Sequence, residues 1–186
     1  MAVPVEMEVE DDFEVEEQLQ IPPDLARLHT AAESGKADDL SQALRELNVS
    51  INEPGEDGDT ALHLACLYGH AQCAQILLEA GASVDVKDED GALPLHDACA
   101  GGYVDIVKAV LMACGDKQKV KSLLDTADVD GDTPLHNAAR GNHGSVVEVL
   151  LTNGASSSIT NVQGKTAAEL SDDPNVQKLL EEAPSQ

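Results

Sequence analysis

The chain has 186 residues, of which 35 are acidic and 11 are basic, so its formal net charge is −24. The hydrophobic fraction of 42% is enough for a buried core, and one Phe, two Tyr and no Trp make that core aliphatic. Nucleic acids and anionic membranes are bound through basic patches, so this charge disfavours both as partners. It favours a basic protein partner, or else it contributes only solubility.

No segment approaches the roughly 18 consecutive apolar residues that a membrane helix needs. The first residues are acidic and resemble neither a signal peptide nor a transit peptide, so we expect a protein of the cytoplasm and/or the nucleus. The four cysteines do not suggest a disulfide framework in a chain of this size. Mutual repulsion of the acidic charges favours a monomer.

Residues 1–20 contain eight acidic side chains and no basic one. Such a composition is typical of disorder, and we expect an acidic tail that folds onto a basic partner or keeps the protein soluble. A further hypothesis is that this tail pairs with the basic cluster Lys117, Lys119 and Lys121 and shields a binding groove. The simpler interpretation of that cluster is a solvated loop.

A short motif recurs along the rest of the chain. Residues 58–66 read GDTALHLAC, and residues 91–99 read GALPLHDAC, 33 positions later. Residues 131–139 read GDTPLHNAA after a further 40 positions, and weaker copies lie at 27–32 and 164–170. Self-similarity of this kind is the signature of repeat architectures, so the sequence predicts an array of similar units.

Each copy of the motif continues in the same way. The LHxA segment is followed by a turn at Gly69, Gly102 or Asn142, residue types that suit the left-handed conformation at the end of a helix. A second apolar stretch with helical spacing comes next, and Gly81 and Gly154 are predicted to end it. An extended stretch and an Asp/Gly-rich turn lead to the next copy. The predicted unit is therefore helix, turn, helix and extended finger.

The TPLHxAA motif with its 33-residue period resembles the ankyrin repeat. The resemblance covers roughly residues 24–182 and implies an all-α ankyrin-repeat solenoid with β-hairpin fingers along one side. We expect this domain at residues 21–182, followed by a short C-terminal tail at 183–186. The expected repeats, of which the first and last are degenerate caps with polar outer faces, are 24–58, 59–91, 92–131, 132–164 and 165–182.

The third repeat departs from the pattern in two ways. Leu93 replaces the motif threonine, so we expect a hydrogen bond of that threonine to be missing there. The repeat also contains seven extra residues, which lie within 113–128. Val120, Leu123 and Leu124 in this insertion have helical spacing, which predicts a short additional helix.

Three motifs resemble sites of chemistry, but each has a simpler interpretation. His63 and His96 each precede a cysteine by three residues, as zinc ligands can, yet the ankyrin resemblance assigns the histidines to the motif and the cysteines to small buried positions. Residues 128–132 resemble the start of a calcium loop without its later Gly and Glu. Residues 164–166 lack the partner glycine of a phosphate-binding loop. We expect no metal, no cofactor and no catalytic activity.

The hypothesis of function rests on the surface of the repeats. The ankyrin resemblance implies that the acidic finger tips lie along one edge and that variable positions of the first helices line a concave groove, with Tyr68 beside it as an aromatic anchor. The residues predicted to contact a partner are Asp57, Asp59, Leu64, Leu67, Tyr68, Asp88, Asp90, Asp97, Asp130, Asp132, Asn137 and Arg140. The simpler interpretations are ordinary turn composition for the aspartates and internal packing for Tyr68.

These features predict a non-catalytic module that binds a protein partner rich in Lys and Arg and serves as an escort or chaperone of that partner. Small acidic ankyrin proteins that escort ribosomal proteins are a precedent within the family that the chain resembles. The alternative is a regulatory or signalling subunit that acts on a kinase, a transcription factor or proteasome assembly, because one fold serves many functions.

Overall fold

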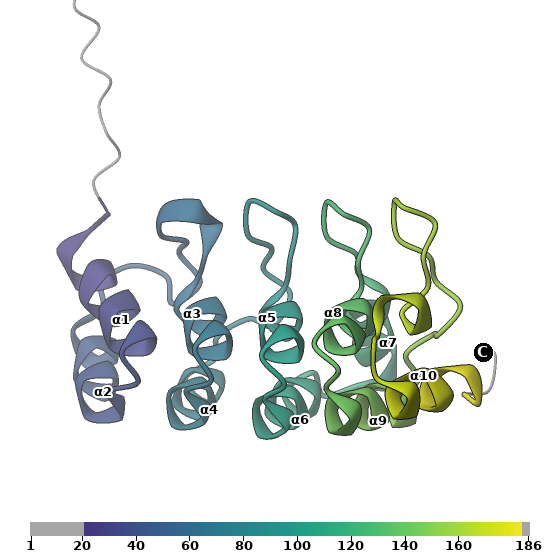
Figure 1. The fold of residues 1–186 in the computed structure, drawn as a ribbon. Helices are drawn as coiled ribbons and strands as arrows, with labels where there is room; N and C mark the ends of the chain where they lie inside the picture. The colour runs from purple at the N-terminus through teal and green to yellow at the C-terminus, as the bar shows by residue number, and fades with distance from the viewer. Residues whose placement is uncertain (1–20, 184–186) are drawn as a thin grey trace, which may run out of the picture.

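The computed structural model describes residues 21–183. Within them the chain forms ten α-helices and two short 3₁₀ helices, and no β-strand. The helices stand in pairs that are stacked in one row, and extended loops project from one edge of the row (Figure 1). The predicted all-α solenoid is confirmed.

Four helix–turn–helix pairs form most of the row. They are α1 (Pro23–Glu33) with α2 (Ala37–Glu46), α3 (Ala61–Leu67) with α4 (Ala71–Glu79), α5 (Pro94–Ala100) with α6 (Val104–Ala113), and α8 (Pro134–Arg140) with α9 (Gly144–Thr152). At the C-terminal end the 3₁₀ helix η2 (Ala168–Leu170) takes the place of a first helix and precedes α10 (Pro174–Glu181). First helices contact first helices and second helices contact second helices, which gives two layers.

The repeated motif fixes the start of the first helices. The Nδ1 atom of His63 accepts a hydrogen bond from the Thr60 N–H at 3.1 Å and lies 2.9 Å from the Thr60 hydroxyl. Thr133 and His136 repeat this arrangement at 3.1 and 2.8 Å. Because the first N–H groups of a helix have no partner within it, such side chains determine where the helix begins.

The same histidines also join neighbouring repeats. The Nε2 atom of His63 faces the Ala92 carbonyl at 3.4 Å, and that of His96 faces the Asp132 carbonyl at 3.2 Å. In the third repeat His96 still accepts the backbone N–H of Leu93, at 2.9 Å, whereas leucine has no hydroxyl to offer. The predicted loss of the threonine bond in this repeat is confirmed.

The turn inside each pair needs a residue with left-handed backbone. Gly69 and Gly102 have φ angles of +74°, and Asn142 has a φ of +58°. Glycine and asparagine adopt this conformation at little cost, so these residues let the second helix fold back on the first. The predicted turns are confirmed.

The insertion in the third repeat forms α7 (Lys117–Asp125), so the predicted additional helix is confirmed. Leu123 and Leu124 are buried, and Val120 packs against the same core. The Asp116 carboxylate caps the helix by accepting the Lys119 N–H at 2.8 Å. The insertion therefore extends the apolar core of the stack.

Two of the lysines on α7 have partners inside the folded domain, and they lie on a helix instead of the solvated loop of the simpler interpretation. Lys119 pairs with Asp85 at 3.2 Å, and Lys121 pairs with Asp125 at 2.9 Å. The alternative hypothesis, in which this cluster pairs with residues 1–20, lies outside the described residues.

The fingers are hairpin-shaped loops rather than the expected β-hairpins. A single isolated bridge, between Thr160 and Thr166, is the only β pairing among residues 21–183. A typical finger is closed by two backbone bonds, as from Asp128 N to Asp132 O and from Gly131 N to Asp128 O, both at 3.0 Å. Other backbone groups bond to the neighbouring finger, which leaves no ladder within the hairpin. One finger also includes the short 3₁₀ helix η1 (Glu56–Gly58).

The core runs through the whole row as one cluster of buried aliphatic side chains. Each first α-helix contributes the leucine that precedes its histidine, and these side chains are at most 1% exposed: Leu28, Leu62, Leu95 and Leu135. Because one pair of helices cannot cover its apolar faces alone, the neighbouring pairs provide the burial.

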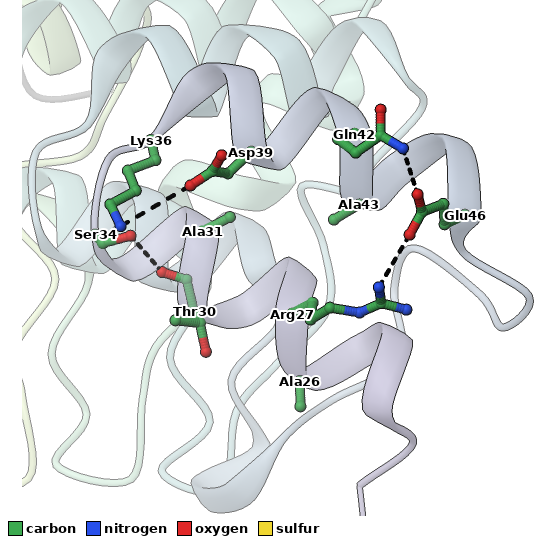
Figure 2. A pocket seen from close by; sticks show the side chains of 10 residues that line it. All are labelled: Ala26, Arg27, Thr30, Ala31, Ser34, Lys36, Asp39, Gln42, Ala43 and Glu46. Carbon is green, nitrogen blue, oxygen red and sulfur yellow. Dashed lines mark hydrogen bonds and ion pairs between the residues drawn. The ribbon is translucent and has the colours of Figure 1, made fainter.

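The N-terminal end of the row is closed by polar and charged side chains. The outer sides of α1 and α2 surround a hollow of about 420 Å³ (Figure 2). On its rim Arg27 pairs with Glu46 at 3.0 Å, and Lys36 lies 3.9 Å from Asp39. A terminal repeat must face water, and its charges here are paired with one another.

Candidate binding surface

The predicted groove residues lie in two rows across the stacked first helices. Leu64, Asp97 and Asn137 follow the motif histidine of α3, α5 and α8, and all three are half-buried. Three residues further on, the predicted residues Leu67 and Arg140 are exposed, as is Ala100 at the same position of the repeat between them. Because α3 contacts α5 and α5 contacts α8, each row crosses three repeats. We call this surface the first-helix face.

The tips of the fingers lie side by side. The N–H of Glu89 donates to the Asp57 carbonyl at 3.2 Å, and the N–H of Val129 donates to the Asp90 carbonyl at 2.9 Å. A third bond joins the next pair of fingers through the Asp130 carbonyl, at 3.0 Å. The side chains of Asp57, Glu89, Asp90 and Asp130 are exposed, and we call these four residues the acidic edge.

Two predicted contact residues of the fingers are used within the domain. Asp132 is only 1% exposed, and its carboxylate pairs with Arg140 and accepts the side-chain amide of Asn161 at 2.8 Å. Its placement at an exposed acidic tip is therefore wrong, because the residue before the motif threonine lies at the base of the finger; its contact with a partner stays a prediction. Asp88 is half-buried and accepts the Ala92 N–H at 2.8 Å.

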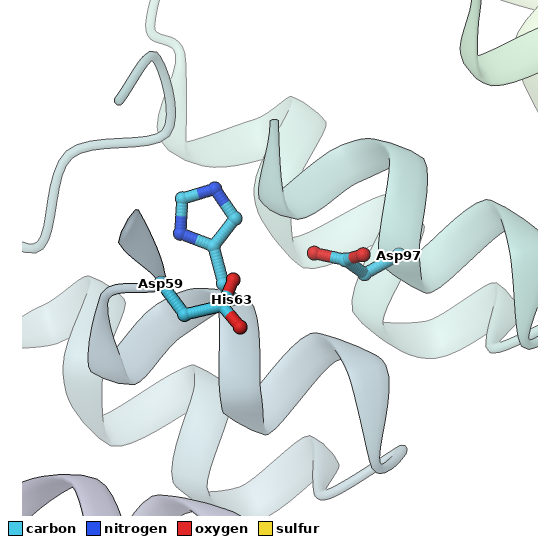
Figure 3. A group of neighbouring side chains, drawn as sticks. All are labelled: Asp59, His63 and Asp97. Carbon is cyan, nitrogen blue, oxygen red and sulfur yellow. The ribbon is translucent and has the colours of Figure 1, made fainter. Parts of the chain in front are cut away.

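Asp59 is the equivalent residue of the second repeat, and its surroundings are different. The position of Arg140 is occupied here by Leu67, so the cation that pairs with the equivalent aspartate of the fourth repeat is missing. Instead, the ligand atoms of Asp59, His63 and Asp97 lie within 4.8 Å of one another. Figure 3 shows the Asp97 carboxylate directed from α5 toward Asp59 and His63. Among residues 21–183, no ion pair involves Asp59 or Asp97.

The electrostatics of this pair follow from burial and from like charge. The Oδ2 atom of Asp97 is inaccessible to solvent and has no hydrogen-bond partner. Burial, together with the charges of Asp59 and Asp88, raises the pKa of Asp97 to about 8. Burial, together with Asp88 and Asp57, raises the pKa of Asp59 to about 6. At neutral pH the Asp97 side chain therefore holds a proton for most of the time.

A metal ion fits this group poorly, because His63 is already engaged. Its Nδ1 atom accepts the Thr60 N–H at 3.1 Å, and its Nε2 atom faces the Ala92 carbonyl at 3.4 Å. Coordination through Nδ1 would break the bond that starts α3, and coordination through Nε2 would break the bond to the next repeat. Asp59 and Asp97 are therefore two neighbouring carboxyl groups that have no cationic partner among the described residues.

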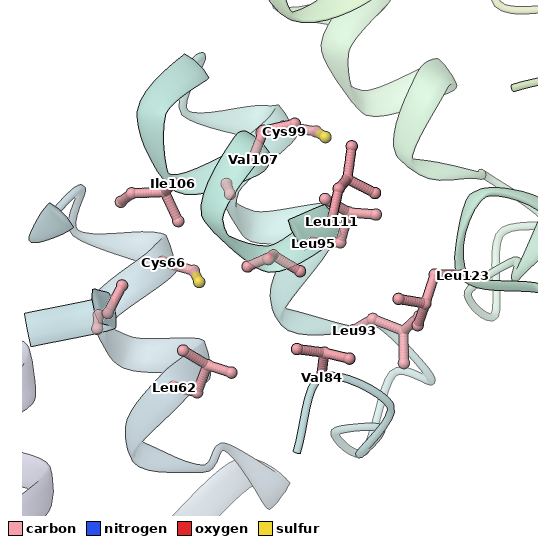
Figure 4. Packing of buried hydrophobic residues seen from close by; sticks show 14 of the residues in the cluster. Leu62, Cys66, Val84, Leu93, Leu95, Cys99, Ile106, Val107, Leu111 and Leu123 are labelled. Atoms are coloured by element: carbon pink, nitrogen blue, oxygen red, sulfur yellow. The ribbon is translucent and has the colours of Figure 1, made fainter. Parts of the chain in front are cut away.

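The cysteines that follow the motif histidines belong to the core. Cys66 and Cys99 are fully buried among apolar side chains such as Leu62, Leu95 and Ile106 (Figure 4). Burial raises the pKa of both thiols well above the ordinary value, so they stay protonated at neutral pH. These cysteines occupy the small buried positions that the ankyrin resemblance assigns to them.

The calcium-loop-like segment is a turn. The Oδ1 atom of Asp128 accepts the backbone N–H of Asp130 at 3.0 Å and that of Asp132 at 2.9 Å. A carboxylate that closes its own loop in this way is typical of aspartate in turns. The interpretation of these aspartates as turn residues is confirmed.

An exposed apolar patch lies at the end of α3. Leu67 is 44% exposed and Tyr68 is 47% exposed. The Tyr68 ring is stacked on His70, with 6.3 Å between the ring centroids. His70 is in turn bonded to the Glu33 carbonyl of the first repeat at 2.8 Å. Tyr68 thus combines partial internal packing with an accessible face.

The sequence predicts Asp59 and Asp97 separately as contact residues, but not that the two carboxylates meet. A comparison of equivalent positions could have shown this. Asp59 precedes the motif threonine of one repeat, and Asp97 follows the motif histidine of the next. Neither repeat has a basic residue at the position of Arg140.

Comparison with known families agrees with the fold. Residues 28–119 match a family model described as ankyrin repeats (3 copies), and residues 123–171 match one described as ankyrin repeats (many copies). A search of curated proteins finds no match. In the part of the chain from 21 to 183, no helix has the length and apolarity needed to cross a bilayer. Together the two family models cover most of the repeats seen in the structure, and the chain belongs to the ankyrin repeat family.

Proposed function

We propose that this protein is a non-catalytic interaction module that binds a Lys/Arg-rich segment of a partner protein and serves as its escort. Ankyrin repeats in general are protein–protein interaction modules. The observation that supports a basic partner is the alignment of exposed carboxylates along the acidic edge, next to the first-helix face. Carboxylates held at fixed spacing by backbone bonds between fingers can meet several cations of one extended segment.

The charge of the domain supports the same proposal. Residues 21–186 keep 27 acidic and 11 basic side chains, because eight of the 35 acids lie in residues 1–20. Six of the basic residues already pair within the domain: Arg27, Lys36, Lys119, Lys121, Arg140 and Lys178. An uncompensated negative surface attracts basic ligands from a distance and accelerates their association.

An escort role follows from the same electrostatics. A strongly basic segment binds nucleic acids unselectively through their phosphates. A protein that covers such a segment with carboxylates would prevent this until the partner reaches its assembly site. Binding through exposed charges is weakened by salt, because the screening length is about 8 Å at physiological ionic strength.

The test is affinity capture from cell extract over a series of salt concentrations. We compare the wild-type protein with a triple variant of the acidic edge, Asp57→Asn, Asp90→Asn and Asp130→Asn. The matched control removes three exposed acids of the second helices, Glu79→Gln, Asp105→Asn and Glu148→Gln.

The proposal predicts that the wild type and the control enrich basic proteins and that the edge variant loses them at lower salt. Equal behaviour of the two triple variants would contradict it. Salt-insensitive recovery of one kinase, one transcription factor or one proteasome component would favour a regulatory subunit instead.

A further inference from the structure

We propose that Asp59 and Asp97 form an anchor site that takes one cationic side chain, a lysine or an arginine, from the basic segment of the partner. This inference rests on the proposed function, which supplies the basic partner. It adds where the partner is anchored, and that this site accepts a single cationic side chain.

The fourth repeat shows how this fold holds a cation at the equivalent place. Asp132 precedes the motif threonine there, and Arg140 at the end of α8 reaches back to its carboxylate. The side-chain amide of Asn161, in the next finger, donates to the other carboxylate oxygen at 2.8 Å. The buried carboxylate is thus satisfied by a guanidinium and an amide of the same chain.

The second repeat has the carboxylate but neither of these donors. Leu67 stands at the position of Arg140, and Asp88 of the next finger stands at the position of Asn161. A third acid, Asp97, comes from α5 and brings its carboxylate to Asp59. Where the fourth repeat supplies a guanidinium and an amide, the second repeat supplies only carboxyl groups.

An inaccessible acceptor without a donor is costly in a folded protein. The Oδ2 atom of Asp97 is such an acceptor, and it belongs to the residue that faces Asp59. A cationic side chain placed between the two carboxylates would supply both the missing donor and the missing charge. This is the observation, independent of the acidic composition, that points to a ligand.

An amino-acid side chain fits the surroundings better than a bare ion. In the fourth repeat the side chain of Arg140 extends to the carboxylate of Asp132, the residue before the motif threonine. In the second repeat Leu67 occupies that position and is 44% exposed, so the alkyl stem of an incoming residue can lie on it. His63, the third possible ligand of a metal, is engaged through both nitrogens.

Binding of a cation at this site should release a proton from the protein. The acidic groups that act on the pair are Asp57 and Asp88. The other titratable neighbours are His63, Cys66 and Cys99. Burial lowers the pKa of His63 and raises those of both thiols, so these three are neutral at pH 7. The empty site retains a proton on Asp97, whose pKa is about 8. A cation that enters must displace this proton, so its affinity should increase as the pH rises from about 6 to about 8.

The experiment uses a fluorescein-labelled decalysine peptide as the probe and the full chain as the protein. Two variants are matched to side chains that the fold already carries at equivalent positions: Asp97→Asn, as at Asn137, and Asp59→Ala, as at Ala92. Asp90→Asn makes the same Asp-to-Asn substitution on the acidic edge and is the control. We expect each site variant to bind about tenfold more weakly or worse, and the control less than about fivefold.

Calorimetry in buffers of different ionisation enthalpy adds a readout that a structural role would not change. At pH 7 the wild type should release close to one proton per bound peptide, and Asp97→Asn should release almost none. The Leu67→Arg variant supplies an internal cation at the Arg140 position. It should raise the unfolding midpoint and weaken decalysine binding as much as the two site variants do.

The outcomes separate this inference from the proposed function. If the wild type shows no salt-sensitive decalysine binding, the proposed function fails. If the wild type binds but Asp97→Asn resembles Asp90→Asn, and no proton is released, only the anchor site fails. If Zn²⁺ or Ca²⁺ alone raises the unfolding temperature of the wild type but not of Asp97→Asn, the site belongs to a metal and the proposal is overturned.

Discussion

The guanidinium of Arg140 pairs with the Asp132 carboxylate, which is only 1% exposed, inside the fourth repeat. Arg140 itself is about half exposed, so the pair combines a buried anion with a cation at the surface. The pair explains how a row of acidic repeats can keep one aspartate at the base of a finger. It also defines what the second repeat lacks.

Removal of this guanidinium should destabilise the protein. Arg140→Ala leaves a buried carboxylate whose only other side-chain donor is the amide of Asn161. Because the arginine is partly solvated, we expect a loss of about 1–3 kcal/mol in the free energy of unfolding. Urea denaturation followed by circular dichroism measures the change, with exposed Arg45→Ala as the control. An Arg140→Ala variant as stable as this control would contradict the assignment.

Asp97 should make the protein less stable as the pH rises. Its pKa is about 8 in the folded protein and near 3.8 ordinarily, so the folded state binds more protons between these values. Stability from this group is greatest at the acidic end of the window and decreases toward pH 8. Asp97→Asn should raise the stability at pH 8 and remove this slope. Thermal unfolding from pH 5 to pH 9 tests both effects, and an unchanged slope would refute the burial of this carboxyl.

The motif histidines should produce the opposite dependence at lower pH. Burial is the main cause that lowers the pKa of His63, His96 and His136 below the ordinary 6.5. The unfolded state then binds more protons than the folded state, so stability is lost as the pH falls below about 6.5. The double variant Asp59→Ala and Asp97→Asn removes the competing carboxyls. In it, unfolding midpoints measured from pH 7 to pH 5 should decrease steadily; a flat profile would count against neutral buried histidines.

The core leucine of the third repeat should matter far more than the exposed leucine of α3. Leu95 is fully buried between neighbouring repeats, so Leu95→Ala should cost about 2–5 kcal/mol. Leu67→Ala removes a half-exposed side chain and should change stability by less than about 1 kcal/mol. Urea midpoints at pH 7 distinguish the two, and similar losses in both variants would contradict the described packing.

The local structure was predictable because the same residues recur at equivalent positions of the repeats. Thr60 and His63 recur as Thr133 and His136, and the same hydrogen bonds start both helices. The left-handed turns at Gly69 and Asn142 follow from residue type alone. The additional helix at 117–125 was predicted from the helical spacing of Val120, Leu123 and Leu124.

The candidate site was less predictable, because it depends on which side chains of neighbouring repeats meet. Asp132 and Asp130 lie two residues apart, yet one is buried in an ion pair and the other is exposed at a tip. Their different burial follows from the bend of the finger, which places Asp130 at the tip and Asp132 at the base. The contact of Asp59 with Asp97 spans two repeats, and the fingers replace ladder bonds with bonds to each other, as from Val129 N to Asp90 O. Such long-range geometry is not encoded in the motif.

Binding of a basic segment to this surface is tested most directly by titrating the isotope-labelled protein with decalysine at low salt and following the amide signals by NMR. If the acidic edge and the anchor site bind the basic segment, the largest shifts occur at Asp57, Asp59, Asp90 and Asp97, and added salt reverses those at the tips first. Shifts concentrated on the second helices α4, α6 and α9, or spread evenly over all exposed acids, would contradict a dedicated basic-segment surface.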